Sequence, residues 1–247
     1  MSPPDRLAGC LVDPASPEAA ASFSLTALRP AALPAFLSSH PQADFLRRTG
    51  FAARPGELAL GPAAAPSGNG LFAVLGLGDD FSPFAYGGLA TALPEATTWH
   101  LEAGQPEQAQ PGQESDHETA TLGFVLGAYH YEEFMKSRRA PARLVLPEPA
   151  PAAALAAAEA TFLARDLINT PANLLGPAEL ADAARRLAAA FGASATLTEG
   201  APLAARYPAI AAVGAGSARP PVVVHIAWSG SEAMAHAPLL ALCGKGV

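Results

Sequence analysis

The sequence predicts an α/β protein whose sheet is largely parallel or mixed. Helical segments alternate with short apolar segments in its second half, which is the pattern of helices packed on a sheet. Half of the 247 residues are apolar, so a sizeable core can be buried. Stretches rich in Pro and Gly separate the segments and mark turns and loops.

The first half has two predicted strands and one predicted helix. The apolar run Leu71–Leu75 follows a stretch rich in Pro, Ala, Ser and Gly at 61–70, which predicts a loop and then a buried strand. The polar stretch Gly104–His117 predicts a long loop. Apolar residues at helical spacing predict an amphipathic helix over Thr119–Lys136, and Ala142–Leu146 predicts a second strand.

A linker is predicted between the halves. Pro147–Ala153 consists mainly of proline and alanine, a composition typical of connecting segments. We therefore expect a domain boundary near residue 150, with an N-terminal α/β domain over 1–150 and a second domain over 151–247.

The second half has sharper boundary signals. Pro171 disfavours helix at Thr170, Pro177 suits the first turn of a helix, and Gly192 is a typical helix end. Val222–Trp228 and Pro238–Cys243 are apolar enough to predict fully buried strands. The expected elements are helices at Ala154–Asn169 and Pro177–Phe191, and strands at Ala195–Thr198, Ala209–Val213, Val222–Trp228 and Pro238–Cys243.

Composition and charge argue against several classes of protein. The net charge of −7 disfavours nucleic-acid binding, which needs a basic surface. The most apolar stretch, Pro149–Leu163, is interrupted by prolines and Glu159, so we expect no membrane span. The N-terminus lacks the apolar segment of a secretory signal. Two distant cysteines suggest a reducing cytoplasm, and Cys243 is expected to be a buried thiol.

Common catalytic motifs are incomplete. Two segments, Gly76–Gly78 and Gly214–Gly216, resemble the start of a dinucleotide-binding turn, but the third glycine of that motif is absent from both. The residues around Lys245 do not match the P-loop motif. The sequence has no Gly-x-Ser-x-Gly window and no histidine pair at zinc-binding spacing. His225 lies in a predicted strand and is expected to be a core residue. These motifs alone predict an α/β protein without a complete catalytic set.

Three segments resemble motifs of the M17 leucyl aminopeptidase family. Ala164–Asn173 is similar to the "A-R-D/N-L-x-N-T/x-P-x-N" run that opens the family's catalytic domain. Val213–Pro221 looks like its "V-G-x-G-S-x-x-P-P" segment, and Cys243–Val247 looks like "x-G-K-G-[VI]". The motifs occur in the family's order over about 85 residues, which makes the match specific. Residues 1–150 bear only a diffuse resemblance to the family's macro-like N-terminal α/β domain.

The resemblance implies an activity, cofactors and partners. It implies a cytoplasmic, metal-dependent aminopeptidase that releases N-terminal residues, leucine-type, from peptides with a free N-terminus, and that assembles as a homohexamer. Lys245 would be a ligand of one of two divalent ions, Zn²⁺ or Mn²⁺. That role needs a neutral amine, because an ammonium has no lone pair, and neighbouring cations lower a lysine pKa. Neither nucleic acid nor a membrane is an expected partner.

The chain departs from the family pattern after Lys245. In the family the motif continues into "T-F-D-[TS]-G-G", and carboxylates, a second lysine and an arginine follow. Because one lysine cannot hold two divalent ions, we expect this chain to bind no catalytic metal, to have no catalytic residue of its own and to hydrolyse nothing. We expect it to be part of a longer protein. The alternatives are a non-catalytic module for small-ligand binding or assembly and, more weakly, a nucleotide-binding domain.

Overall fold

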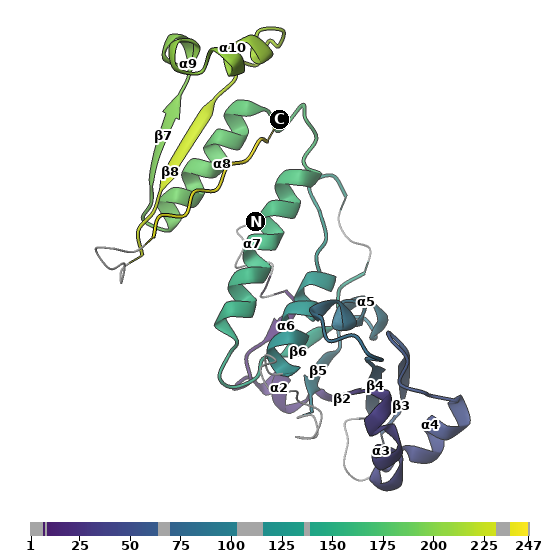
Figure 1. Ribbon diagram of the computed structural model, residues 1–247. Coiled ribbons are helices and arrows are strands. Elements are labelled where there is room, and N and C mark those ends of the chain that lie inside the picture. Colours follow the sequence, from purple (N-terminus) through teal and green to yellow (C-terminus); the bar gives the residue numbers. More distant parts are fainter. Residues whose placement is uncertain are drawn as a thin grey trace. The chain divides into compact units, whose positions relative to one another are not determined.

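The computed structural model describes residues 7, 9–63, 70–102, 116–135, 139–230 and 238–246. The chain divides into two compact units, Met1–Arg165 and Asp166–Val247, and each is described by itself. The division falls inside the long helix α7 (Ala152–Asn169) (Figure 1). The domain boundary expected near residue 150 remains a prediction.

The N-terminal unit is built on a six-stranded mixed sheet of order β1-β6-β5-β2-β4-β3. Neighbouring strands run parallel except β3, which runs antiparallel to β4. The mixed α/β fold predicted from the sequence is thereby confirmed. The strands are β1 (Leu11–Val12), β2 (Phe23–Leu28), β3 (Leu58–Pro62), β4 (Leu71–Gly76), β5 (Thr98–Leu101) and β6 (Arg143–Val145).

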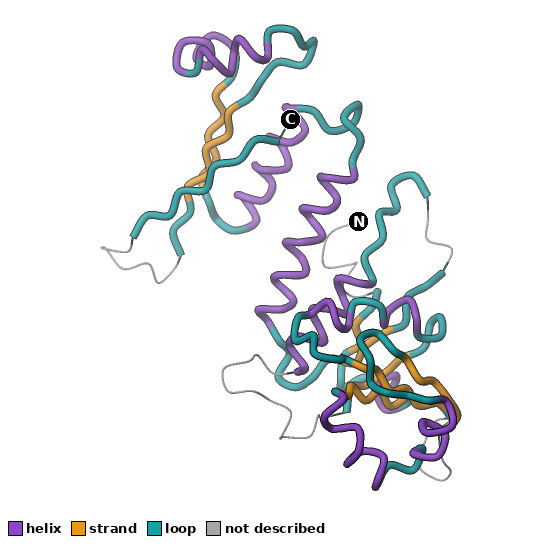
Figure 2. The backbone as a smooth tube through the Cα atoms, turned by 45° about the vertical axis from the view of Figure 1, so that its right-hand side comes forward, coloured by secondary structure: helices purple, strands orange, loops and turns teal. Residues whose placement is uncertain are grey.

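Each face of this sheet has a core of its own. Along β4, Phe72 and Val74 belong to one buried cluster, whereas Ala73 and Leu75 belong to the other, as the two-residue period of a strand requires. The smaller cluster packs against residues of α3 (Leu33–Ser39) and α4 (Ala43–Thr49). The larger cluster surrounds Trp99. Figure 2 shows the strands of this unit gathered together with helices around them.

The larger cluster is covered by helices from later in the chain. It includes residues of α5 (Leu89–Ala92), α6 (Asp116–Gly127) and the first turns of α7. Shorter elements complete the unit: α2 (Pro17–Ala20) and the 3₁₀ turns η1 (Pro30–Ala32) and η2 (Pro83–Tyr86). Among the described residues, no helix is long and apolar enough to cross a membrane.

The predictions for this half are largely confirmed, with one helix too long. The strands at Leu71–Leu75 and Ala142–Leu146 correspond to β4 and β6. The helix predicted over Thr119–Lys136 ends at Gly127, and glycine is a poor residue for continuing a helix. The same glycine lies against the backbone of Gly87, where a Cβ would come within 1.8 Å of the carbonyl oxygen. Most of the loop predicted at Gly104–His117 lies outside the described residues.

The C-terminal unit combines a two-stranded antiparallel ribbon with short helices. The strands β7 (Ser194–Thr198) and β8 (Val223–Ala227) pair from Ser194 with Ala227 to Thr198 with Val223. The helix α8 (Pro177–Ala190) runs alongside them (Figure 1). The helices α9 (Gly200–Arg206) and α10 (Pro208–Gly214) lie between the two strands in the chain.

Several predictions for this unit need correction. Ala209–Val213 is helical, in α10, because Pro208 occupies its first turn and alanine favours helix. The strand predicted at Val222–Trp228 exists as β8, but much of it, including His225, is exposed. Pro238–Cys243 has no strand structure and is exposed, as is the Cys243 thiol. These apolar segments are not buried because, among the described residues, β8 pairs only with β7.

Candidate functional site

The first family-like segment spans the end of α7 and the turn after it. In the N-terminal unit, the Arg165 guanidinium donates a hydrogen bond of 2.8 Å to the Leu126 carbonyl in the last turn of α6 and lies over the Tyr129 ring. A cation at the C-terminal end of a helix stabilises its unpaired carbonyls. Phe162 also contacts Tyr129, with 5.1 Å between ring centroids. Arg165 therefore anchors α7 on α6.

The remainder of this segment makes the turn into α8. The backbone N–H and the hydroxyl of Thr170 both donate to the Asp166 carbonyl, at 3.0 and 2.6 Å. After Pro171 the chain folds back, and the N–H groups of Leu174 and Leu175 donate to the Pro171 carbonyl. Proline at this point stops the helix, as predicted.

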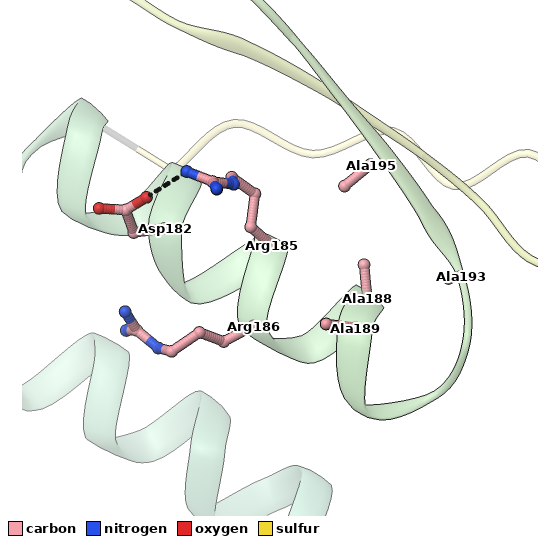
Figure 3. Close-up of a pocket in the computed structure, with 7 residues that line it drawn as sticks. All are labelled: Asp182, Arg185, Arg186, Ala188, Ala189, Ala193 and Ala195. Carbon is pink, nitrogen blue, oxygen red and sulfur yellow. Dashed lines mark hydrogen bonds and ion pairs between the residues drawn. The ribbon is translucent and has the colours of Figure 1, made fainter.

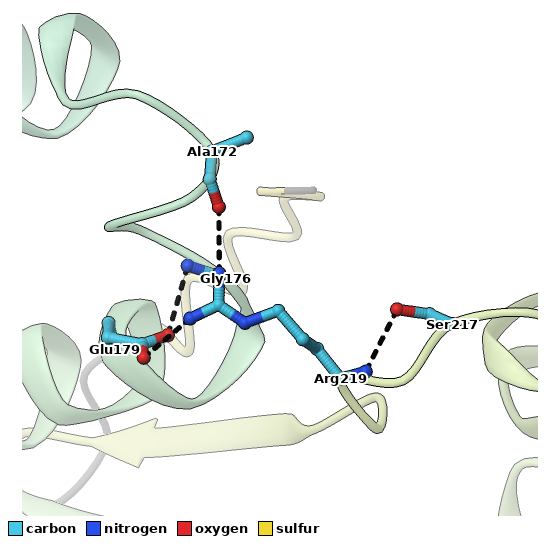
Figure 4. A network of polar contacts seen from close by, with 5 residues as sticks. All are labelled: Ala172, Gly176, Glu179, Ser217 and Arg219. Atoms are coloured by element: carbon cyan, nitrogen blue, oxygen red, sulfur yellow. Dashed lines mark hydrogen bonds and ion pairs between the residues drawn. The ribbon is translucent and has the colours of Figure 1, made fainter.

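A polar network joins this turn to the second family-like segment (Figure 4). The Arg219 guanidinium donates to the Ala172 carbonyl at 2.7 Å and to a Glu179 carboxylate oxygen at 2.6 Å. The other Glu179 oxygen accepts from the Gly176 N–H at 3.0 Å, which satisfies a backbone donor at the start of α8. A single guanidinium thus fixes the turn, the start of the helix and the segment around Ser217 to one another.

This network lowers the pKa of the Glu179 carboxyl and crowds the space beside Gly176. Backbone N–H groups at the start of α8, and then the Arg219 charge, lower the pKa of the Glu179 carboxyl. A Cβ at Gly176 would come within 2.4 Å of the Arg219 guanidinium carbon. Sequence reasoning missed Glu179 and Arg219 as partners. A glutamate three residues into a helix is a capping signal, but nothing in the sequence identifies Arg219 as its partner.

The second segment bends sharply after α10. Ser217 N–H donates to the Gly214 carbonyl, and the Ser217 hydroxyl accepts from the Arg219 N–H at 3.0 Å. A Cβ at Gly214 would lie 2.5 Å from the Pro221 ring. The segment is therefore a compact turn that delivers the chain into β8. Gly214 thus allows the close approach of Pro221.

The predicted metal ligand Lys245 lies in the third segment. Residues 238–246 run without helix or strand, and Lys245 is exposed. The segment is held against α8 at Gly246, where a Cβ would collide with the Leu180 side chain at 2.0 Å. The structure brings the first two segments together through Arg219, and the third contacts α8 next to them.

The donor set around Lys245 does not by itself fit two divalent ions. Such ions need several oxygen or nitrogen donors that converge on one point. Across the part of the chain that the structure describes, no group of three or more His, Cys, Asp or Glu side chains is placed to hold a metal ion.

The C-terminal unit also has an open hollow beside α8 (Figure 3). Its volume is about 510 Å³, and its lining is mostly alanine with Asp182, Arg185 and Arg186. Asp182 and Arg185 form an exposed ion pair at 3.1 Å. Exposed pairs one turn apart on a helix contribute little energy. The described lining offers neither a nucleophile nor a metal ligand set, so the hollow supports no catalytic role.

Comparison with known proteins decides the family. The family model "M17 aminopeptidase, N-terminal domain" matches residues 23–147, and "Cytosol aminopeptidase family, catalytic domain" matches residues 162–247. The chain belongs to the M17 cytosol aminopeptidase family. The resemblance inferred from the three segments is confirmed.

Relatives and solved structures agree with this assignment. A probable cytosol aminopeptidase of Rhodococcus opacus is 36% identical over 145 residues, which cover 52% of this chain and 28% of the relative. The crystal structure of cytosol aminopeptidase from Coxiella burnetii is similar with a TM-score of 0.73 and 28% identity, over 90% of this chain and 47% of that one. The structure of the bottromycin maturation enzyme BotP in complex with Mn matches with a TM-score of 0.69 and 32% identity, over 85% of this chain and 46% of that one. This M17 chain therefore spans about half the length of these solved structures.

Proposed function

We propose that this chain is part of a metal-dependent aminopeptidase that releases N-terminal residues, leucine-type, from peptides by two-metal hydrolysis. The observation that carries the proposal is the match of both M17 family models, together with the motif Cys243–Val247, which contains Lys245. In this proposal Lys245 donates its neutral amine to one of two divalent ions, Zn²⁺ or Mn²⁺. A bound Mn in the related BotP structure supports the choice of metal.

The 247-residue chain alone is proposed to be inactive. One amine cannot hold two divalent ions, and the described residues provide no cluster of carboxylates or imidazoles beside it. The resemblance to the family implies that the further ligands follow the lysine motif, and the relatives are longer than this chain. A cytoplasmic location and a homohexamer belong to the same proposal.

The test is an activity assay on the purified chain. Leucine p-nitroanilide is offered with Mn²⁺ or Zn²⁺, and the cytosol aminopeptidase of Coxiella burnetii is assayed in parallel. We expect no release by the chain above the metal-only blank, and metal-dependent release by the relative. Metal-dependent release by the chain that disappears in Lys245→Ala would overturn the proposed inactivity while supporting the metal role of Lys245.

A second candidate function is a non-catalytic assembly module. The observation that favours it is the exposed apolar surface of the C-terminal unit, where Leu239 and Leu242 are 96% and 87% exposed. Such a surface is typical of an interface. Sedimentation of the chain at increasing concentration tests this second candidate, which requires a defined oligomer of the chain; a monomer at every concentration would exclude it.

A further inference from the structure

The N-terminal unit contains a cavity at the carboxyl ends of two parallel strands. Asp13 and Pro14 directly follow β1, and Leu146 and Pro147 directly follow β6, its parallel neighbour. The first turns of α7 complete the wall with Leu155 and Glu159. The cavity is a hollow that is open to solvent, with a volume of about 720 Å³. That size and this position at the strand ends are typical of small-molecule sites in α/β proteins.

The lining combines an apolar wall with carboxylates. Leu7, Leu11, Leu146 and Leu155 provide hydrocarbon surface, and prolines 14, 147 and 149 add rigid apolar walls. The charged residues of the lining are Asp13, Glu148 and Glu159. Among the described lining residues none is cationic. An apolar wall with one sign of charge selects ligands of the opposite charge.

The dipole of helix α7 offsets the negative charge of the lining carboxylates only weakly. The N-terminal end of a helix carries about half a positive charge. Three carboxylates outweigh it several times over. One Asp13 oxygen accepts the Ala15 N–H at 2.8 Å, which fixes the carboxylate at the end of β1. The charge of the whole unit has the same sign, because its sequence contains 10 Lys and Arg against 17 Asp and Glu.

We infer that this cavity binds a small organic cation, an ammonium group carried on an apolar hydrocarbon body. The hydrocarbon packs on the leucines and prolines, and the ammonium lies toward Asp13, Glu148 and Glu159. The site lies wholly within the N-terminal unit and does not depend on Lys245 or on peptidase activity. Its failure and the failure of the proposed function are therefore separate outcomes.

Three ligands of nearly equal shape test the charge preference. The full chain is titrated by calorimetry with 4-phenylbutylammonium, 4-phenylbutan-1-ol and 4-phenylbutanoate at neutral pH. We expect the ammonium to bind about tenfold more tightly than the alcohol, since several partly exposed carboxylates each contribute modestly, and the carboxylate ligand to bind most weakly. Raising the salt concentration should narrow the difference between ammonium and alcohol. Equal affinity for ammonium and alcohol would overturn the inference.

Variants then locate the site. Glu159→Gln and Glu148→Gln are expected to weaken ammonium binding several-fold and to leave alcohol binding unchanged. The matched control is Glu133→Gln, an exposed glutamate of the same unit that is not among the lining residues, and it should retain the parent affinity. If the control weakens binding as much as Glu159→Gln, the preference reflects the overall charge of the unit, and the assigned cavity is wrong. Circular dichroism confirms that each variant is folded.

Discussion

The two tryptophans show how differently the units of this M17 chain are built. Trp99 in the N-terminal unit is 0% exposed within the larger core, whereas Trp228 in the C-terminal unit is 65% exposed. The N-terminal sheet is covered on both faces, while the C-terminal ribbon leaves Leu239, Leu240 and Leu242 largely in solvent. Apolar composition therefore leads to burial only where partner elements cover the segment.

The largest expected effect comes from exchanging these tryptophans for alanine. Trp99→Ala should lower the free energy of unfolding by about 3–5 kcal/mol, because it empties a fully packed site. Trp228→Ala should cost about 1 kcal/mol, since it removes an exposed ring and one hydrogen bond to the Phe191 carbonyl. Urea denaturation followed by circular dichroism measures both. Equal losses would contradict the difference in burial.

The two cysteines should differ in their effect on stability at alkaline pH. Burial raises the pKa of the Cys10 thiol from 9.0 to about 12, whereas the Cys243 thiol is exposed. Above pH 9 the unfolded chain loses the Cys10 proton while the folded chain keeps it. Stability should therefore fall by about 1.4 kcal/mol per pH unit until the folded thiol also ionises near 12.

The measurement is the difference between the parent and Cys10→Ala in denaturation series from pH 8 to 10.5. That difference removes the contribution of other groups that titrate in alkali. Cys243→Ala is the matched control and should follow the parent. Parallel curves for the parent and Cys10→Ala would show that the thiol does not carry the effect.

A smaller effect is expected from adding a methyl group at two glycines, one next to rigid backbone and one next to a flexible side chain. At Gly123 of α6, a Cβ would meet the Pro83 carbonyl oxygen at 1.9 Å, and backbone cannot move aside easily. At Gly176, the obstacle is the end of the Arg219 side chain. Gly123→Ala should cost about 1–3 kcal/mol, and Gly176→Ala less than about 1 kcal/mol. Thermal unfolding compares them, and the reverse order would contradict the account of both sites.

The smallest effect is expected at Glu179. Because its pKa is lowered in the folded state, its contribution to stability is present above its ordinary value of 4.5 and is lost as pH falls through the lowered value. Glu179→Gln should therefore lower Tm slightly at pH 7, and the difference from the parent should shrink as the pH falls below 4.5. Glu199→Gln, another exposed glutamate of this unit, is the control. A difference in Tm that does not shrink as the pH falls would rule out the carboxylate charge as its cause.

Local signals predicted β4, β6, α7 and α8, because proline, glycine and apolar periodicity act within a few residues. Strands β1, β2, β3 and β5 were not predicted. The helix boundaries at Asn169, Pro177 and Gly192 follow directly from such signals. The exposure of Pro238–Cys243 could not be predicted in this way, since burial of an apolar strand depends on partners that are distant in the sequence. The helix at Ala209–Val213 was missed because Ile210 and Val213 favour a strand, whereas Pro208 and the alanines favour the helix that forms.

The sequence identified the residues of the candidate site by their motifs but did not predict their contacts. The resemblance of Cys243–Val247 to a family motif identifies Lys245 as a candidate ligand. Arg219 also lies within a family-like motif, Val213–Pro221. That Arg219 bridges Ala172 and Glu179 depends on a fold that brings residues about 40 positions apart into contact. Its role is structural, and no local signal distinguishes such an arginine from one that faces solvent.

The most direct test supplies the remainder of the catalytic domain. Residues 1–247 are fused to the part of Coxiella burnetii cytosol aminopeptidase that follows the position aligned with Val247, and Mn²⁺ affinity and leucine release are measured together. We expect a metal-dependent peptidase in which Lys245→Ala lowers both Mn²⁺ affinity and activity by more than about 100-fold, while Lys136→Ala, the other lysine of the sequence, changes neither. If Lys245→Ala retains the Mn²⁺ affinity and activity of the parent fusion, Lys245 is not a metal ligand and the proposed function is wrong.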